Sequence, residues 1–157
     1  MNKIGFIPAR SGSTRLKNKN IRILAHRPLI YWTVRSAIQS NSLDKIIFSS
    51  DSKRYYQLLL RYLKKDKIKT DLIEFDYREK KFTKTKSKIF DYIKSGLINK
   101  FNLNENDLIV LMLPTCPLRS LNTIKKSIKL SEVTRKNIFS VTKYDFHLSF
   151  ALKIFKN

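Results

Sequence analysis

The sequence predicts an α/β fold in which helices flank a mainly parallel β-sheet. Short runs of β-branched and apolar residues alternate with longer amphipathic stretches, which is typical of βα units. No linker, internal repeat or Gly/Ser-rich segment breaks this alternation, and the chain has only 3 glycines. Because 157 residues suffice for one sizeable hydrophobic core, we expect a single domain over residues 1–157.

Each expected strand is a short apolar run bounded by turn-forming or polar residues. The expected strands span residues 4–8, 45–49, 71–75, 108–113, 138–142 and 149–155. The expected helices are amphipathic stretches over residues 28–39, 52–63, 84–98 and 123–130. Apolar and aromatic residues recur at helical spacing in the second helix and predict a face that is mostly core or partner-facing rather than a base-stacking platform: Tyr55, Tyr56, Leu59, Tyr62 and Leu63. Pro28 fits the first turn of the first helix, where its missing N–H costs nothing.

The first expected strand leads into a loop that has the character of a phosphate-binding site. The apolar run stops at Pro8, and small residues at positions 11–13 let the backbone pass close to a ligand. Four cations follow within ten residues: Arg10, Arg15, Lys17 and Lys19. The loop lacks G-x-x-x-x-G-K-[ST], and one glycine cannot make G-x-G-x-x-G, so the P-loop and dinucleotide-binding classes are disfavoured. We expect the ligand to be an anion, most plausibly a nucleoside triphosphate.

This loop resembles the signature A-R-x-x-S-[KT]-R-x-x-x-K-N of sugar nucleotidyltransferases. Three further segments carry the resemblance to the N-terminal portion of the acylneuraminate cytidylyltransferases, the CMP-N-acetylneuraminic acid synthetases. Residues 27–34, RPLIYWTV, are similar to K-P-L-I-x-W-T-I, and residues 45–51, KIIFSSD, resemble a second strand ending in V-S-T-D. Residues 111–119, LMLPTCPLR, resemble L-L-Q-P-T-S-P-L-R. The order and spacing of all four segments agree with the family.

The resemblance implies a Rossmann-like, nucleotide-diphospho-sugar transferase-like fold and a cytidylyltransferase activity. In this reaction an oxygen of a nonulosonic, sialic-type acid attacks the α-phosphorus of CTP, giving the CMP-sugar and pyrophosphate. The implied catalytic residues, which would neutralise the phosphates, are Arg10, Arg15 and Lys19. The implied nucleotide-binding residues are Ala9, Arg10, Ser13, Arg15, Lys19, Asn20 and Arg78, the last at the cytosine-reading position. The implied substrate-binding residues are Thr115, Arg119 and His147.

Some positions depart from the family pattern. Thr14 stands where the family usually has lysine, although a cation follows immediately at Arg15. Leu113 replaces a glutamine that helps to position the acceptor sugar, and a leucine side chain can neither donate nor accept a hydrogen bond. Glu79 replaces the proline that follows the cytosine-reading arginine, and Phe150 stands about where a substrate-binding lysine is expected. These departures lead us to expect weakened sugar binding.

The resemblance also implies Mg²⁺ as a cofactor and a homodimer as the usual assembly. In the family, the segment that supplies the Mg²⁺-binding aspartates and the dimerisation element lies beyond the position of Asn157, so we expect no metal site in this chain. Asp51 is the carboxylate beside the expected cleft. It could contact a metal or ribose, or cap the helix that follows it.

The amino-acid composition limits the alternative functions that the chain could have. The formal charge of +21, from 33 Lys and Arg against 12 Asp and Glu, attracts polyanions. Nucleic-acid binding is disfavoured, because the excess is spread along the chain and no helix-turn-helix, zinc-knuckle or RNP-type motif is present. We keep two alternatives open, a catalytically impaired nucleotide-binding remnant and a basic nucleic-acid-binding domain.

Cellular context follows from three further features. No apolar run reaches a membrane span, and the short start of the chain does not resemble a signal peptide. The single cysteine, Cys116, cannot form an internal disulfide and is interpreted as a small buried residue in a turn between two prolines, rather than as a catalytic thiol. We therefore expect a cytoplasmic protein with no membrane partner.

Overall fold

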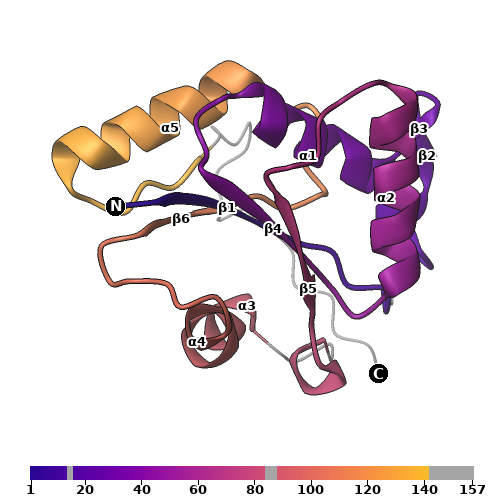
Figure 1. The fold of residues 1–157 in the computed structure, drawn as a ribbon, viewed down its shortest axis with the longest axis horizontal. Coiled ribbons are helices and arrows are strands. Elements are labelled where there is room, and N and C mark those ends of the chain that lie inside the picture. The colour runs from indigo at the N-terminus through magenta and orange to yellow at the C-terminus, as the bar shows by residue number, and fades with distance from the viewer. Residues whose placement is uncertain (14–15, 84–87, 142–157) are drawn as a thin grey trace, which may run out of the picture.

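A four-stranded parallel sheet forms the centre of the protein, in the order β5–β4–β1–β6. The computed structural model describes residues 1–13, 16–83 and 88–141. The strands are β1 (Lys3–Pro8), β4 (Lys45–Ser50), β5 (Ile73–Tyr77) and β6 (Leu108–Leu111). The chain builds outward from β1 to β4 and β5, then crosses back to place β6 on the other side of β1 (Figure 1). Ligands in such sheets bind where the order reverses, at the carboxyl ends of the strands.

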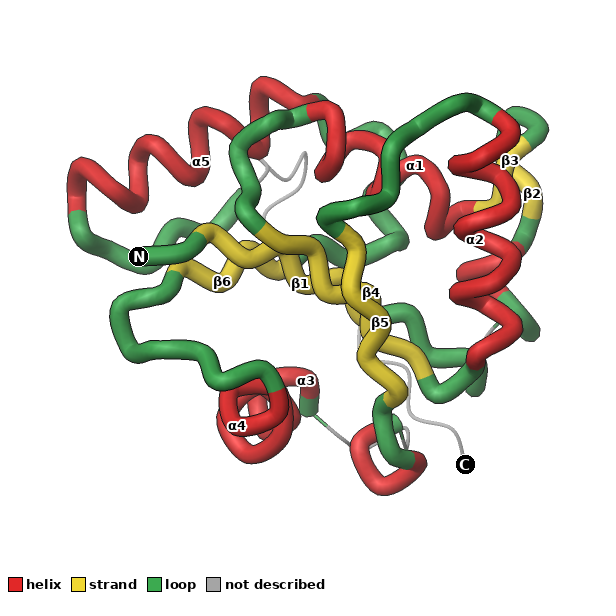
Figure 2. The backbone as a smooth tube through the Cα atoms, viewed as in Figure 1, coloured by secondary structure: helices red, strands yellow, loops and turns green. Residues whose placement is uncertain are grey.

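Helices cover both faces of this sheet, as Figures 1 and 2 show. One face carries α1 (Leu29–Gln39), α2 (Lys53–Lys65) and α5 (Leu121–Thr134). The other carries α3 (Ile89–Tyr92), the π-helix η3 (Ile93–Leu97) and α4 (Ile98–Lys100), which follow one another without a break. Shorter elements are the 3₁₀ turns η1 (Lys19–Ile21) and η2 (Lys80–Phe82) and the antiparallel pair β2 (Ile23–Leu24) and β3 (Arg27–Pro28). The α/β fold class is therefore confirmed.

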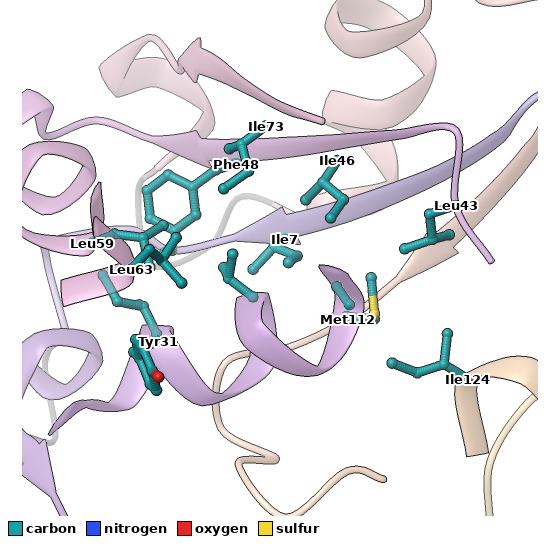
Figure 3. Packing of buried hydrophobic residues seen from close by; sticks show 14 of the residues in the cluster. Ile7, Tyr31, Leu43, Ile46, Phe48, Leu59, Leu63, Ile73, Met112 and Ile124 are labelled. Atoms are coloured by element: carbon teal, nitrogen blue, oxygen red, sulfur yellow. The ribbon is translucent and has the colours of Figure 1, made fainter. Parts of the chain in front are cut away.

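Side chains that alternate along the strands build a core on each face. Ile7, Ile46 and Phe48 are fully buried in the larger cluster, under α1 and α2 (Figure 3). Phe6 and Ile47, their neighbours in sequence, point to the opposite face and pack with the α3–α4 segment. Gly5 lets β1 pack closely against the larger cluster, because a Cβ at this position would lie 2.9 Å from both Leu43 Cδ1 and Met112 Cε.

The strand predictions hold for β1 and β4 and are corrected elsewhere. β5 begins at Ile73 rather than at residue 71, and β6 ends at Leu111 rather than at residue 113. The strand predicted over residues 138–142 is wrong where the structure describes it, since residues 138–141 have no regular structure. Phe139 and Val141 are 73% and 92% exposed, so no neighbouring strand or core selects an extended ladder there. The strand predicted over residues 149–155 lies outside the described residues.

The helix predictions hold in place and differ at the ends. Pro28 is the N-cap of α1, with extended ψ of 148°, rather than a residue of its first turn. The helix predicted over residues 84–98 starts at Ile89 in the described part of the chain, and residues 84–87 lie outside it. α5 is longer than predicted, because Ser120 caps it by accepting a hydrogen bond from the Thr123 N–H. Within the described residues, no helix combines the length and apolar character that crossing a membrane requires.

Candidate functional site

The loop after β1 is anchored to the carboxyl end of the neighbouring strand β4. The Ala9 N–H donates to the Ser49 carbonyl at 2.8 Å, and the Ser50 hydroxyl donates to the Ala9 carbonyl at 2.7 Å. Ala9 and both serines are fully buried. The loop therefore leaves the sheet from a fixed point at the edge where ligands of parallel sheets bind.

Asp51 holds the next part of this loop with both carboxylate oxygens. One accepts the Ser11 N–H at 2.7 Å, and the other accepts the Ser11 hydroxyl at 3.0 Å. The alternative in which Asp51 caps the following helix is wrong, because the N-cap of α2 is Ser52. Asp51 instead acts as an anchor for the loop.

Asn20 fixes the same loop from the inside. It is only 5% exposed, and its side-chain amide donates to the Arg10 carbonyl at 2.9 Å. The nucleotide contact predicted for Asn20 stays a prediction, and the structure gives its amide nitrogen an internal role in the loop. The Arg10 guanidinium reaches across the edge of the sheet and donates to the Thr83 carbonyl at 3.1 Å.

The described cations of this loop form no salt bridge with a described carboxylate. Arg10, Ser13 and Lys19 are partly exposed, and Lys19 begins the 3₁₀ turn η1. In the described part of the chain, neither Arg10 nor Lys19 forms a salt bridge. Arg15 and Thr14 lie outside the described residues. The described part of the loop thus presents three cations, at Arg10, Lys17 and Lys19, that a phosphate group could engage.

Arg78 approaches this loop from the end of β5. Its backbone N–H donates to the Ser50 carbonyl at 2.9 Å, and its side chain is only 3% exposed. Among the residues that the structure describes, the Arg78 Nε has no hydrogen-bond partner. Burial lowers the pKa of the Arg78 guanidinium, while the charges of Asp76 and Asp51 act in the opposite direction. A buried, unpartnered N–H calls for an acceptor, and a ligand at this edge could supply one.

A buried polar cluster that the sequence analysis missed lies beneath Arg78. Asp76 is fully buried and accepts hydrogen bonds from the hydroxyls of Ser49 (2.5 Å) and Tyr92 (2.6 Å) and from Lys100 Nζ (2.6 Å). Burial raises the pKa of the Tyr92 hydroxyl, and its bond to Asp76 adds to the shift. One signal was available: Asp76 and Arg78 are two residues apart where β5 ends, and residues two apart in an extended chain point to the same side.

The loop after β6 lies at the same edge, beside β1. Thr115 is exposed, and Arg119 is half-buried with an Nη1 that is buried and unpartnered. Burial lowers the pKa of Arg119. Leu113 is 44% exposed at the position of the expected glutamine. Cys116 is a free, exposed cysteine, so the prediction that it is buried is wrong: the turn that holds it lies on the surface. Parallel pairing of β6 with β1 brings this loop next to the loop of Arg10, although no hydrogen bond in the described residues joins the two. His147 lies outside the described residues.

The described carboxylates do not fit a Mg²⁺ site. No group of three or more His, Cys, Asp or Glu side chains in the described ranges could hold a metal ion. The oxygens of Asp51 are engaged by Ser11, and those of Asp76 by three donors. The expectation of Mg²⁺ therefore rests on the resemblance alone.

A surface hollow away from this edge is lined by the turn before α1, by α1 itself and by the segment after α2. Its residues include Arg27, Tyr31, Trp32, Arg35 and Asp66. Asp66 is paired there with Arg27 and Tyr31. Since none of the predicted site residues lines this hollow, we place the candidate site at the carboxyl ends of the strands instead.

Comparisons with known proteins agree with the fold and the resemblance. Residues 4–70 match the family model described as cytidylyltransferase. The chain is 33% identical over 150 residues to the CMP-N,N'-diacetyllegionaminic acid synthase of Legionella pneumophila, covering 90% of this chain and 58% of that protein. It is 31% identical to the N-acylneuraminate cytidylyltransferase of Escherichia coli, covering 89% of this chain and 31% of that protein.

A solved structure supports the fold alone. It is the CMP:2-keto-3-deoxy-manno-octonic acid synthetase complexed with CTP, with a TM-score of 0.64 and 15% identity over 86% of this chain and 49% of that one.

The chain spans between about a third and three fifths of the length of the two curated relatives described above.

Proposed function

We propose that this chain, which matches the cytidylyltransferase model over residues 4–70 and is similar to curated sugar-acid cytidylyltransferases, binds CTP and transfers the cytidylyl group to a nonulosonic acid of the sialic type. The observation that carries the proposal is the loop after β1. It is fixed to β4 by Ala9, Ser11 and Asp51. Within the described residues its Arg10 and Lys19 form no salt bridge, and the buried Arg78 follows β5 at the same edge of the sheet.

In this proposal each group performs one physical task. Arg10 and Lys19 neutralise phosphate charge, so that the electron pair of the breaking bond can leave with pyrophosphate. Arg78 donates to an acceptor of the base through its unpartnered Nε. Thr115 and Arg119, on the neighbouring loop, orient the sugar acid for in-line attack on the α-phosphorus. Arg15 and His147, outside the described residues, are proposed to join the phosphate and sugar contacts.

Calorimetric titration with CTP, UTP and GTP, followed by a pyrophosphate-release assay with several nonulosonic acids and Mg²⁺, tests the proposal. We expect tightest binding for CTP and release of pyrophosphate with at least one sugar acid. Equal affinity for all three nucleotides would remove the cytosine assignment.

A second candidate is CTP binding without turnover. It is favoured by the exposed Leu113 and by the absence of a free carboxylate cluster in the described residues. Tight CTP binding with no pyrophosphate release would select it. Salt-sensitive binding of an oligonucleotide without preference for CTP would instead select a nucleic-acid-binding role, to which the +21 charge is suited.

A further inference from the structure

The buried aromatic ring of Tyr92 supports the side chain of Arg78. The Arg78 Cζ lies 5.5 Å from the centroid of this ring, which is within the range of a cation–π contact. Tyr92 and Arg78 are each 3% exposed, so water screens this contact little. The direction of the guanidinium therefore depends on where the ring lies.

Three sets of contacts fix that ring. Its hydroxyl donates to the fully buried Asp76 at 2.6 Å. Its faces and edges meet Phe82 and Phe6, with centroids 4.9 and 6.3 Å away. The third set is its contact with Gly96, in the π-helix η3, where a Cβ would lie 2.6 Å from Tyr92 Cε2 and 2.8 Å from Cδ2. The ring occupies space that exists only because this residue has no side chain.

The π-helix η3 is a second, independent indication that this arrangement has a function. Single π turns are rare inside helices and often occur at functional sites. η3 lies directly between α3 and α4, and its Gly96 lies against the Tyr92 ring that meets Arg78. Lys100, at the end of α4, completes the shell around Asp76 at 2.6 Å.

The chemistry of pyrimidines explains what a fixed guanidinium could achieve. Cytosine offers two adjacent acceptors, O2 and N3, whereas in uracil N3 carries a hydrogen and becomes a donor. A donor that can swing freely satisfies O2 of either base. A donor held in one orientation can distinguish them, because the wrong base leaves buried polar groups unpaired.

We propose that Tyr92 is a positioning residue for base selection, which holds Arg78 so that the site distinguishes cytosine from uracil. Asp76, Phe82 and Gly96 keep the ring in place. This inference rests on the proposed CTP-binding function and adds the element that sets its selectivity.

The test is the ratio of UTP to CTP dissociation constants, measured by calorimetry for the full chain and its variants. Tyr92→Leu removes the ring and is expected to lower the ratio about thirtyfold, the scale of a desolvated cation–π contact. Gly96→Ala pushes the ring from its place and is expected to lower the ratio by roughly threefold to tenfold, since the clash must be relieved by movement. Tyr92→Phe keeps the ring and is expected to retain most of the ratio.

Tyr56→Leu is the matched control. Tyr56 stacks on Phe75 with centroids 4.6 Å apart, on the opposite face of the sheet from Tyr92. Its removal should lower the melting temperature and leave the UTP to CTP ratio unchanged. If Tyr92→Leu fails to fold, Gly96→Ala decides the matter.

Two results would overturn the proposal in distinguishable ways. A wild-type protein that binds UTP as tightly as CTP refutes the proposed function and this inference together. A wild-type preference for CTP that survives in Tyr92→Leu and Gly96→Ala refutes this inference alone. In that case the ring only stabilises the fold, and any loss of affinity is shared equally by the two nucleotides.

Discussion

Replacing Asp51 separates two opposite effects on nucleotide binding. Asp51 anchors Ser11 through two hydrogen bonds, at 2.7 and 3.0 Å, yet its negative charge lies beside a loop proposed to bind phosphates. Removing the anchor should weaken CTP binding, and removing the charge should strengthen it. Asp51→Ala removes both, whereas Asp51→Asn removes the charge and keeps an oxygen that can accept the Ser11 N–H.

In Asp51→Ala, the loss of the two hydrogen bonds should outweigh the loss of the negative charge. A hydrogen bond to a charged group contributes roughly 1.5 to 3 kcal/mol, and two such bonds at a half-exposed site should together be worth about 2 to 3 kcal/mol. A charge about 4 Å from another in water contributes only about 1 kcal/mol, and salt reduces it further. We therefore expect Asp51→Ala to bind CTP about tenfold more weakly than wild type, and Asp51→Asn to bind it at least as tightly.

Calorimetric titration at physiological salt, with thermal melts of each variant, is the assay. Asp51→Ala should melt roughly 4 to 12 °C lower, at about 2 to 4 °C per kcal/mol for a protein of this size. Asp107→Ala is the matched control, because Asp107 accepts the N–H groups of Asn2 and Asn104, at 2.7 and 3.0 Å, at the opposite edge of the sheet. It should lose stability without losing CTP affinity. If Asp51→Ala binds CTP as tightly as Asp51→Asn, the anchoring argument fails.

Three further predictions concern charge, packing and pH. Lys19→Ala should raise the CTP dissociation constant, measured by calorimetry, about tenfold. Lys129→Ala, at an exposed position of α5, should leave it unchanged. Gly5→Ala should lower the free energy of unfolding in urea by roughly 1 to 3 kcal/mol, because its Cβ would overpack the core, and a wild-type value would contradict the packing described. Hydrogen bonds from Arg27, then from Tyr31, lower the pKa of Asp66 from 3.8 to about 2. Because its pKa is lowered, the Asp66 carboxyl contributes stability above about pH 4, and this stability is lost as pH falls toward 2. The melting temperature of Asp66→Asn should therefore fall less steeply than that of wild type as pH decreases over this range.

The sequence predicts those strands whose apolar runs stop at a clear turn signal. β1 stops at Pro8 as expected, and β4 extends one residue past the predicted end. β5 starts later than predicted, because its ladder with β4 begins where Ile46 meets Ile73. Residues 138–141 show the limit of the pattern, since an apolar run becomes a strand only where a neighbour pairs with it.

The candidate site was predictable in composition and less so in contacts. Cations and small residues mark the loop, and the resemblance supplies Arg78. The partners that hold these groups are distant in sequence, such as Asp51 for Ser11 and Asp76 for Tyr92. No local pattern encodes such pairs, because they depend on which strands become neighbours in the sheet. Asn20 shows the same limit, since its amide fixes the loop from within.

The two faces of the sheet divide stability from selectivity. The face under α1 and α2 buries apolar side chains such as Ile7, Phe48 and Leu59, whose removal from water stabilises the fold directly. The other face, near the carboxyl edge, buries a carboxylate and a guanidinium, at Asp76 and Arg78. Taking such charges out of water costs several kcal/mol, which their attraction and hydrogen bonds at best offset, so this cluster contributes little net stability. What it does provide is a fixed geometry, because each donor to Asp76 comes from a different element: β4, α3 and α4. Substitutions on the apolar face should therefore change melting temperature with little effect on base preference, and substitutions in the polar cluster should change base preference out of proportion to melting temperature.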